Sequence, residues 1–439
     1  YSYIMYHRLR VGLLVVFCLS IGNLFGLFAQ HSTDYYSLSM VGNAGNGIFA
    51  PYYLSANKHG LVTHSKSGYL RASVFKGLEM NKRFSYEFGI DLVGLMSSTS
   101  PVSYYSDGNL KTYNPGVSSF FIQQAYIGMK YRMIFISAGC RELTDEVVNF
   151  ELSSGGLVWS GNARPIPQVR AGFIDFVDIP FTKGWVQIKG ELAYGKFMDN
   201  DFLRDHYNYY NQYITTDALY HHKSISFRSN PDKPFVVTIG AELAAQFGGT
   251  KRYYEKGILI DSLTMKSPTR LKDFFKILFP SSGDGQTNEG DQAYYYGNHV
   301  GQWNLSAEYR FKDNSSVRGY FEWYFDDASG MGKFNGWDGL WGLEYKSGKK
   351  NWLSNVVLEY LDMTNQSGPL NWCPSDYNDP KLDIEATGAD DYYNNYFYNG
   401  WAHYGLSNGT AMAKSLLYNT DGYMRYKHCL LYTSPSPRD

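Results

Sequence analysis

The segment 390–405 carries the residue types that bind sugars. It reads DDYYNNYFYNGWAHYG and combines carboxylates, amides and aromatic rings. A pyranose ring is recognised by flat aromatic faces against its C–H side and by carboxylate or amide groups against its hydroxyls. The candidate polysaccharide-binding residues here are Asp391, Tyr392, Tyr393, Asn395, Tyr396, Tyr398 and Trp401. The alternative is an aromatic girdle at a membrane interface combined with a loop packed into a barrel lumen.

A second candidate is the segment 149–168, which has no apolar alternation and is stiffened by two prolines. Trp159, Asn162 and Arg164 would present an aromatic and hydrogen-bonding edge to a sugar. The alternative interpretation is a structural constriction that folds into a pore.

The sequence predicts no enzymatic activity. It contains no GxSxG elbow, no HExxH helix and no phosphate-binding glycine loop. Glu308 and Glu322 are the carboxylates that come closest to a catalytic pair, and Arg310 and Arg318 stand near enough to keep both ionised. A glycosidase needs one of its two carboxyls protonated. These four residues are therefore predicted to form a charge ladder along a barrel lumen.

Metal, cofactor and nucleic-acid binding are not predicted either. The acidic stretch 284–291 lacks the twelve-residue calcium loop with its terminal Glu. His221 and His222 are adjacent in a strand-like run, so their side chains should face opposite sides. The formal net charge of −1 gives no global field that would recruit a nucleic acid.

The elements that must position these residues are β-strands. Residues 304–327 read NLSAEYRFKDNSSVRGYFEWYFDD, two alternating runs joined by a polar turn, which predicts a hairpin. Similar runs recur along the chain, many of about ten residues, longer than the usual strand of a soluble sandwich. The composition, with 17% aromatic residues and a mean hydropathy of −0.36, is typical of a membrane β-barrel with a polar lumen.

Loop lengths alternate in the manner of outer-membrane barrels, with short periplasmic turns and long external loops. Short turns are predicted at 81–83, 312–316 and 347–350, and long connections at 97–118, 198–232, 248–298 and 364–415. One amphipathic helix is predicted at 267–280, inside a long loop or as part of a plug; a position on the membrane surface is the alternative. The expected fold is all-β, a large antiparallel transmembrane β-barrel of about 16–18 strands when complete, with that short helix in a loop or plug.

The two ends of the chain are predicted to lie outside the barrel. A basic stretch followed by the apolar run 11–29 predicts a secretory signal peptide over residues 1–29, with an N-terminal membrane anchor as the alternative. Residues 30–428 form the predicted barrel. Residues 429–439, CLLYTSPSPRD, read as a non-native tail, which implies that the closing strands are missing from this chain.

Four stretches carry a family resemblance: 152–167 (LSSGGLVWSGNARPIP), 219–224 (LYHHKS), 326–341 with its DDASGMG and GWDGLW motifs, and 392–405 (YYNNYFYNGWAHYG). Their order resembles the capsule-assembly Wzi family of outer-membrane proteins, in the form found in Gram-negative bacteria of the Bacteroidetes type. The resemblance spans roughly residues 40–427. It adds Trp337, in the GWDGLW motif, to the candidate polysaccharide-binding residues.

The resemblance implies a large antiparallel barrel with a periplasmic helical element and a loop-plugged lumen. The implied function is that of an outer-membrane lectin that binds capsular or other surface polysaccharide and helps to anchor or assemble the capsule. Its implied partners are the polysaccharide, outer-membrane lipid and, during biogenesis, the barrel-assembly machinery. The alternative is a substrate-selective diffusion porin, because a polar lumen suits either function.

Overall fold

The computed structural model describes residues 27–419. Within that range it leaves out 32–33, 115–119, 145–146, 208, 210–211, 288–290, 293–294, 326–330, 332–335, 350–351, 364–369, 372–385, 388–391 and 394. Most of the predicted signal peptide and the whole predicted tail therefore lie outside the described residues. No helix in the described part of the chain is long and apolar enough to cross a membrane.

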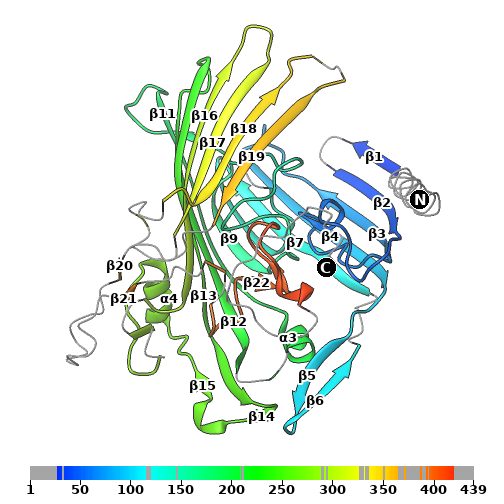
Figure 1. Ribbon diagram of the computed structural model, residues 1–439. Helices are drawn as coiled ribbons and strands as arrows, with labels where there is room; N and C mark the ends of the chain where they lie inside the picture. The colour runs from blue at the N-terminus through cyan, green and yellow to red at the C-terminus, as the bar shows by residue number, and fades with distance from the viewer. Residues whose placement is uncertain are drawn as a thin grey trace, which may run out of the picture.

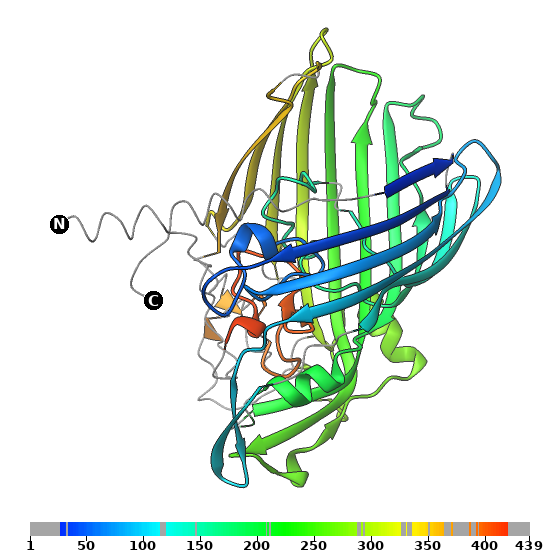
Figure 2. The same ribbon diagram turned by 90° about the vertical axis from the view of Figure 1, so that its right-hand side faces the viewer.

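One antiparallel sheet dominates the molecule and curls around a filled interior (Figures 1 and 2). Its long strands pair in the order β1 (Leu27–His31), β2 (Asp34–Asn43), β3 (Ser67–Lys76), β4 (Phe84–Ser97), β7 (Phe120–Tyr131), β8 (Ile134–Cys140), β9 (Gln168–Phe173), β11 (Val186–Lys196), β12 (Gln212–Ser229), β13 (Phe235–Glu255), β16 (Asn298–Arg310), β17 (Ser316–Phe325), β18 (Gly339–Lys346) and β19 (Asn355–Asp362). The predicted all-β fold with a large antiparallel sheet is confirmed. Among the described residues no ladder joins β19 to β1, so the sheet is open there.

The predicted hairpin at 304–327 is confirmed as β16 and β17, which pair from Gly301↔Phe325 to Arg310↔Ser316. Successive residues of each strand face opposite sides of the sheet, because strand side chains have a period of two. On β16 the apolar set points outward, and Leu305 and Tyr309 are exposed. The polar set points inward, where Gln302 and Asn304 are buried.

The outer face of the sheet forms an apolar belt. Its middle is aliphatic, with exposed Ile90, Ile127, Ile136, Val169, Ile225, Ile239, Leu305, Leu343 and Leu358. Aromatic residues border it at both ends: Trp185, Phe235, Tyr309, Tyr345 and Trp352 lie near the short turns, and Trp303, Trp323, Trp341 and Tyr360 lie toward the long loops. Trp303 and Trp323 are cross-strand partners with ring centroids 6.1 Å apart. From Trp303 to Tyr309 the strand advances roughly 20 Å.

All four predicted long connections contain strand residues, and the longest unpredicted strands lie in two of them. The stretch 198–232 holds β12, which pairs with β11 and β13 along most of its length. The stretch 97–118 holds the hairpin of β5 (Val102–Ser106) and β6 (Asn109–Tyr113). Its turn is Asp107-Gly108, both with positive φ, which matches the twist of a two-residue hairpin.

The remaining small elements lie at the long-loop end or in the loops that enter the lumen from it. They are α2 (Tyr52–Ser55), α3 (Asn200–His206), β14 (Ile258–Leu259), η1 (Asp261–Leu263), β15 (Met265–Lys266), α4 (Leu271–Leu278), β20 (Leu370–Asn371), β21 (Ala386–Thr387), β22 (Ala402–His403), β23 (Leu406–Ser407) and η4 (Leu416–Tyr418). Among the small elements of the described residues, β10 (Val177–Asp178) alone lies near the short turns.

The predicted helix is shorter than expected and lies outside the wall. It begins after Arg270, whose backbone N–H donates to Asp273 in a capping box, whereas Ser267 is engaged by the Lys251 ammonium at 2.8 Å. It ends at Leu278, before Pro280, as its stop signal predicts. Figure 1 shows α4 against the outer side of β12 and β13, so the helix belongs to a loop and not to the lumen filling.

Candidate functional site

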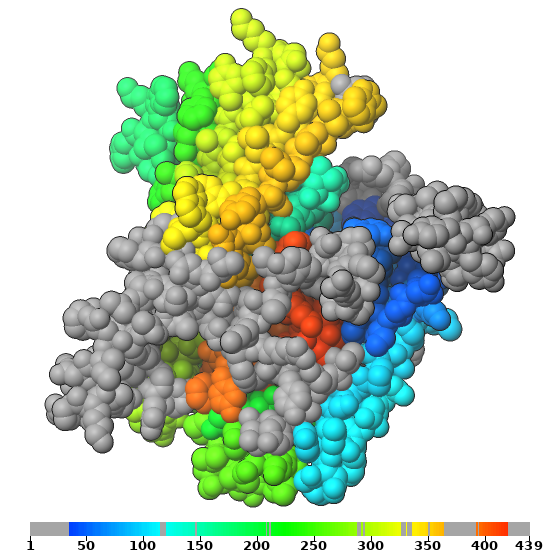
Figure 3. Space-filling model, viewed as in Figure 1, coloured from blue at the N-terminus to red at the C-terminus, as the bar shows by residue number. Residues whose placement is uncertain are grey.

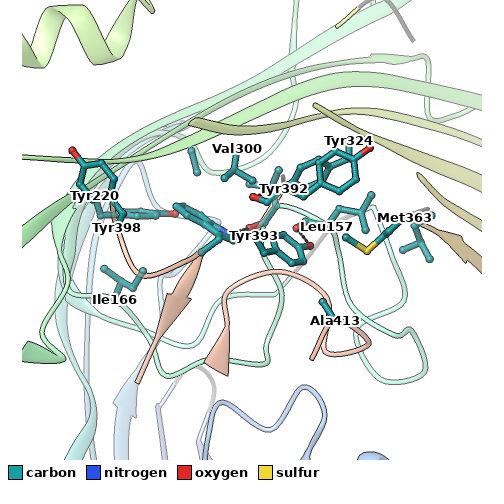
Figure 4. Close-up of a cluster of buried hydrophobic side chains, with 14 of the residues drawn as sticks. Leu157, Ile166, Tyr220, Val300, Tyr324, Met363, Tyr392, Tyr393, Tyr398 and Ala413 are labelled. Atoms are coloured by element: carbon teal, nitrogen blue, oxygen red, sulfur yellow. Dashed lines mark hydrogen bonds between the residues drawn. The ribbon is translucent and has the colours of Figure 1, made fainter. Parts of the chain in front are cut away.

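Two loop segments fill the lumen, and we refer to them as the plug: residues 147–167, between β8 and β9, and the described residues of 392–419. Figure 4 shows their contact with the inward face of the wall. Plug residues in the shared core are Val148, Leu157, Val158, Ile166, Tyr392, Tyr393, Tyr398, Trp401 and Ala413. Wall residues in the same core include Tyr220, Ala244, Val300, Tyr320, Tyr324 and Leu340. The plug and the inward face of the wall therefore share one hydrophobic core.

Polar side chains of the wall fix the plug backbone. The fully buried Glu322 carboxylate accepts the Leu157 N–H at 2.8 Å, and the Gln302 amide oxygen accepts the Val158 N–H at 2.8 Å. Glu359 accepts the Ser154 N–H at 2.7 Å. An irregular segment in a lumen needs such partners, because a buried backbone donor left unpaired costs about 1–3 kcal/mol. Sequence reasoning missed this role of Gln302 and Glu359.

The aromatic residues predicted to bind polysaccharide are mostly the interior of the plug. Trp401 is 1% exposed and its indole N–H donates to the Val158 carbonyl at 2.7 Å. The buried Tyr392 hydroxyl donates to Asp338 at 2.7 Å, and the buried Tyr393 hydroxyl donates to the Leu157 carbonyl. Tyr398 accepts from the Lys251 ammonium at 3.2 Å. Their rings and polar tips are used within the fold, as the alternative interpretation of this segment expects.

The predicted polar residues also serve the plug. Asn162 is buried and donates to the Ser407 carbonyl at 3.0 Å. Asn395 accepts the backbone N–H groups of the two residues that follow Tyr396 and so fixes a local turn. Asp391 lies outside the described residues.

Arg164 is held between two aromatic rings. Its guanidinium carbon lies 4.0 Å from the centroid of Phe121 and 4.1 Å from that of Tyr404. Burial lowers the pKa of Arg164 below its usual value. The guanidinium of this half-buried residue is thus engaged by two aromatic faces.

Three of the predicted residues keep an accessible ring. Trp337 is 70% exposed beside Trp341, at 5.5 Å between ring centroids. Trp159 is half-buried on the wall of a lumen cavity. Tyr396 is half-buried at the long-loop end. The structure does not bring these three together.

The four residues of the predicted charge ladder all stand on the lumen face but do not pair as one ladder. Glu308 binds Arg310 at 2.7 Å. Arg318 binds Glu344 of β18 at 2.5 Å. Glu322 serves the plug backbone instead, as described above.

A cavity of about 520 Å³ lies in the lumen between the plug and the short turns. Its wall is charged, but each ion has a near partner: Arg141 binds Glu87 at 2.8 Å, Arg170 binds Glu191 through two nitrogens, and His222 binds Glu242 at 2.8 Å. Trp159 and Tyr220 add aromatic surface. Compensated charges of this kind offer hydrogen bonds without a net field.

The long-loop end carries a second accessible set, which we call the tyrosine surface: Tyr104, Tyr113, Tyr209, Tyr213, Tyr253, Tyr254 and Tyr396, all half-buried. Tyr213 lies opposite Tyr253 on β12 and β13, with ring centroids 5.0 Å apart, and Tyr396 packs on Tyr213 at 5.4 Å. Tyr209 and Tyr254 pair at 4.7 Å.

The tyrosine surface extends across two structural units. Tyr113, on the β5–β6 hairpin, donates its hydroxyl to the Asp205 carbonyl, next to the end of α3. The Gly257 N–H at the tip of β13 donates to the Tyr209 carbonyl at 2.9 Å. Figure 3 shows the β5–β6 hairpin beside the β13–β14 hairpin at this end, and the Gly108 N–H donates to the Lys256 carbonyl at 2.9 Å. Burial raises the pKa of Tyr396 to about 12 and that of Tyr113 to about 12, so both remain neutral phenols near pH 7.

Of this surface, sequence reasoning identified Tyr396 alone. The signal for the others was the density of tyrosine at 207–213 and 253–254, on either arm of what proves to be a long hairpin. The pairing of these rings depends on β12, of which the sequence predicted only a strand-like run at His221 and His222 within a long connection.

No protein-family model matches this chain, and no curated protein matches it. Among solved structures, one similar fold is Wzi from Escherichia coli, described as an outer membrane protein involved in group 1 capsule assembly and as a carbohydrate-binding β-barrel. The identity is 13%, the TM-score is 0.46, and the match covers 86% of this chain and 63% of the Wzi chain. This chain thus spans less than two thirds of that structure.

Proposed function

We propose that this protein is an outer-membrane, non-enzymatic lectin that binds capsular or other surface polysaccharide through its long-loop end and helps to hold it at the cell. The observation that carries the proposal is the tyrosine surface, because it gathers accessible aromatic rings at one end of a molecule whose lumen is filled. This function is the one implied by the resemblance of the sequence motifs to the Wzi family.

The membrane placement is supported by the apolar belt. An aliphatic band flanked by two aromatic borders is the outer surface expected of a strand wall in a bilayer, where aromatic rings prefer the interfaces. The exposed Trp185 and Trp352 at the short-turn border fit that role. On the opposite, lumen face of the same strands, polar side chains such as Gln302 and Glu322 bond to the plug.

The sugar-binding role is supported by the form of the tyrosine surface. Half-exposed rings such as Tyr209, Tyr213 and Tyr254 offer flat faces for the C–H side of a sugar. Neighbouring charged groups, including Arg204 with its partners Asp201 and Asp205, can bond hydroxyls. A long polymer that meets several weak sites at once is retained by avidity.

The plug argues against the alternative of a diffusion porin. Between the loop end and the lumen cavity the path is occupied by the buried core around Leu157, Tyr393 and Trp401, each bonded in place. In planar bilayers the full-length protein should give no steady conductance. A stable open channel would favour the porin.

Polysaccharide binding is tested with protein purified in detergent and surface polysaccharide from the same cells. Immobilised polysaccharide should retain the protein, and excess free polysaccharide should release it. The control is a polysaccharide of unrelated composition, which should retain much less. Equal retention of both polymers, or of neither, would contradict the proposal.

A further inference from the structure

Helix α4 is attached to the outside of the wall, just beyond the loop-end border of the apolar belt. On its inner side Ile277 is fully buried and Phe274 packs on Phe247 of β13 at 5.2 Å between ring centroids. The Tyr194 hydroxyl of β11 donates to the Phe274 carbonyl at 3.0 Å. The wall residues beneath α4 belong to the outward-facing set, since Tyr194 lies two residues after the exposed Leu192 and therefore on the same face of β11.

The wall under α4 combines an apolar cluster, which includes Ala245, Phe247 and Leu219, with two polar side chains. Lys223 of β12 has the same outward parity as the exposed Ile225, and its ammonium donates to the carbonyls of Ile277 and Leu278. His221, also outward, is fully buried. The end carbonyls of a helix are unpaired and carry partial negative charge, so a lysine there is favourable. The helix thus packs on the apolar cluster and also covers the two polar side chains, accepting the hydrogen bonds of Lys223 at its end.

The opposite side of α4 is a bare apolar stripe. Leu271, Phe275 and Phe279 follow one another at four-residue spacing and are 77%, 56% and 69% exposed. Residues at that spacing lie on one side of a helix. Lys272 and Lys276 border one side of the stripe, where cations are common on helices that lie in a membrane interface, and Lys272 pairs with Asp284 at 3.2 Å.

The stripe lies at the level of the membrane border. Lys223 pairs in register with Leu243, and Leu243 with Gly301, which is two residues beyond Trp303 on the same face of β16. Trp303 belongs to the loop-end aromatic border defined above. Lys223, which bonds the end of α4, therefore lies one outward-facing position from that border. The stripe continues the apolar surface of the belt.

We propose that α4 is an interfacial anchor that inserts Leu271, Phe275 and Phe279 into the lipid leaflet at the long-loop end. The proposal rests on the outer-membrane placement under the proposed function and adds a lipid contact made by a helix and not by strands. Its consequence is mechanical. The helix is continuous with the β13–β16 connection, so it fixes the base of the tyrosine surface relative to the membrane plane.

The test uses spin labels on the full chain, reconstituted in vesicles of phosphatidylcholine and phosphatidylglycerol. In a background whose four cysteines are changed to serine, single substitutions L271C, F275C and F279C carry the label. Collisions with dissolved oxygen, which is enriched in lipid, are compared with collisions with a water-soluble nickel chelate. We expect oxygen to dominate at all three positions, at a depth of about 5–10 Å.

Two labels on other exposed leucines serve as controls. L305C, in the middle of the belt on β16, should favour oxygen, and L110C, on the β5–β6 hairpin, should favour nickel. If L305C favours oxygen but the α4 labels favour nickel, the interfacial helix is wrong while the membrane placement stands. If L305C itself favours nickel, the placement fails and the helix proposal with it. Labels on α4 shielded from both reagents would mean that protein covers the stripe, which also overturns the proposal.

Discussion

The plug and the tyrosine surface are both rich in aromatic residues, yet they use them in opposite ways. In the plug, Trp401 and Tyr393 are buried and each polar tip has a partner within the fold. On the tyrosine surface, rings such as Tyr213 and Tyr254 stack on one another but remain half-exposed. Both regions have a high density of aromatic residues. The exposed fraction of each ring distinguishes the rings that fill the lumen from those that could bind a ligand.

The largest expected effect is loss of the plug core. W401A removes a fully buried indole and its hydrogen bond to Val158, and should lower the free energy of unfolding by about 3–5 kcal/mol. The matched control is W337A, which removes an indole that is 70% exposed and should change it by about 0.5 kcal/mol or less. Urea unfolding in detergent, followed by near-UV circular dichroism, measures both. Equal effects would mean that the plug is not a packed core.

A smaller effect is expected from one polar anchor of the plug. E322A leaves the buried Leu157 N–H without the carboxylate that it bonds at 2.8 Å, at a cost of about 1–3 kcal/mol. The control is E308Q, because Glu308 is partly exposed beside Arg310 and such a pair contributes about 0–1 kcal/mol. The same unfolding measurement applies, with hydrogen exchange at 147–167 as a local readout. Unchanged protection there in E322A would contradict the anchor role.

The burial of a carboxylate at the start of α3 predicts that the free energy of unfolding changes with pH, by about 3 kcal/mol at most. Burial raises the pKa of Asp199 from 3.8 to about 6, although its carboxylate accepts the Tyr404 N–H at 3.0 Å. The folded state therefore holds this proton more tightly than the unfolded state, and the contribution of Asp199 to stability falls as pH rises from about 4 to about 6. D199N keeps the acceptor and removes the titration.

The stability of D199N relative to wild type should thus increase between pH 4 and pH 7. Comparing the two proteins cancels the opposite effect of His403, whose pKa burial lowers to about 4 and which stabilises the fold less as pH falls through that range. Urea unfolding at a series of pH values gives the difference directly. A difference that does not vary with pH would show that Asp199 ionises as it does in the unfolded chain.

The smallest effect in free energy, but the most direct on function, concerns the tyrosine surface. Y254A should weaken polysaccharide binding by about 1 kcal/mol per site, roughly fivefold, through loss of one ring face. Y131A is the control, because Tyr131 is exposed on the outer face near the short turns. Surface plasmon resonance with immobilised polysaccharide measures both. If Y131A weakens binding as much as Y254A, the tyrosine surface is not the binding region.

The alternation of apolar and polar residues predicted the wall strands well where one face is apolar along its length and the other is polar. The hairpin of β16 and β17 has exposed apolar residues on its outer face and residues that hydrogen-bond to the plug on its lumen face. Its two-residue period of hydrophobicity is therefore clear in the sequence. Of strand β12, only a strand-like run at His221 and His222 was predicted, and the length of the strand was missed for a physical reason. Its outward-facing His221 and Lys223 lie under α4, so the apolar half of the alternation is absent there.

The sequence predicts that the candidate site is rich in aromatic residues, but it does not predict which of those residues are accessible. Tyr396 and Tyr398 are two residues apart and of the same type, yet Tyr396 stands on the accessible surface and Tyr398 is buried against Lys251. That distinction depends on contacts with strands more than a hundred residues away along the chain. Local sequence contains no record of it.

The central claim is that the long-loop end of this protein holds polysaccharide at the cell. The direct measurement is the ratio of cell-bound to released polysaccharide in bacteria that carry the full-length gene, lack it, or carry it with Y209A and Y254A combined. Loss of the gene and the double substitution should both shift polysaccharide from cells to medium, with unchanged amounts of the variant protein in the outer membrane. Normal retention in cells without the gene would contradict the claim.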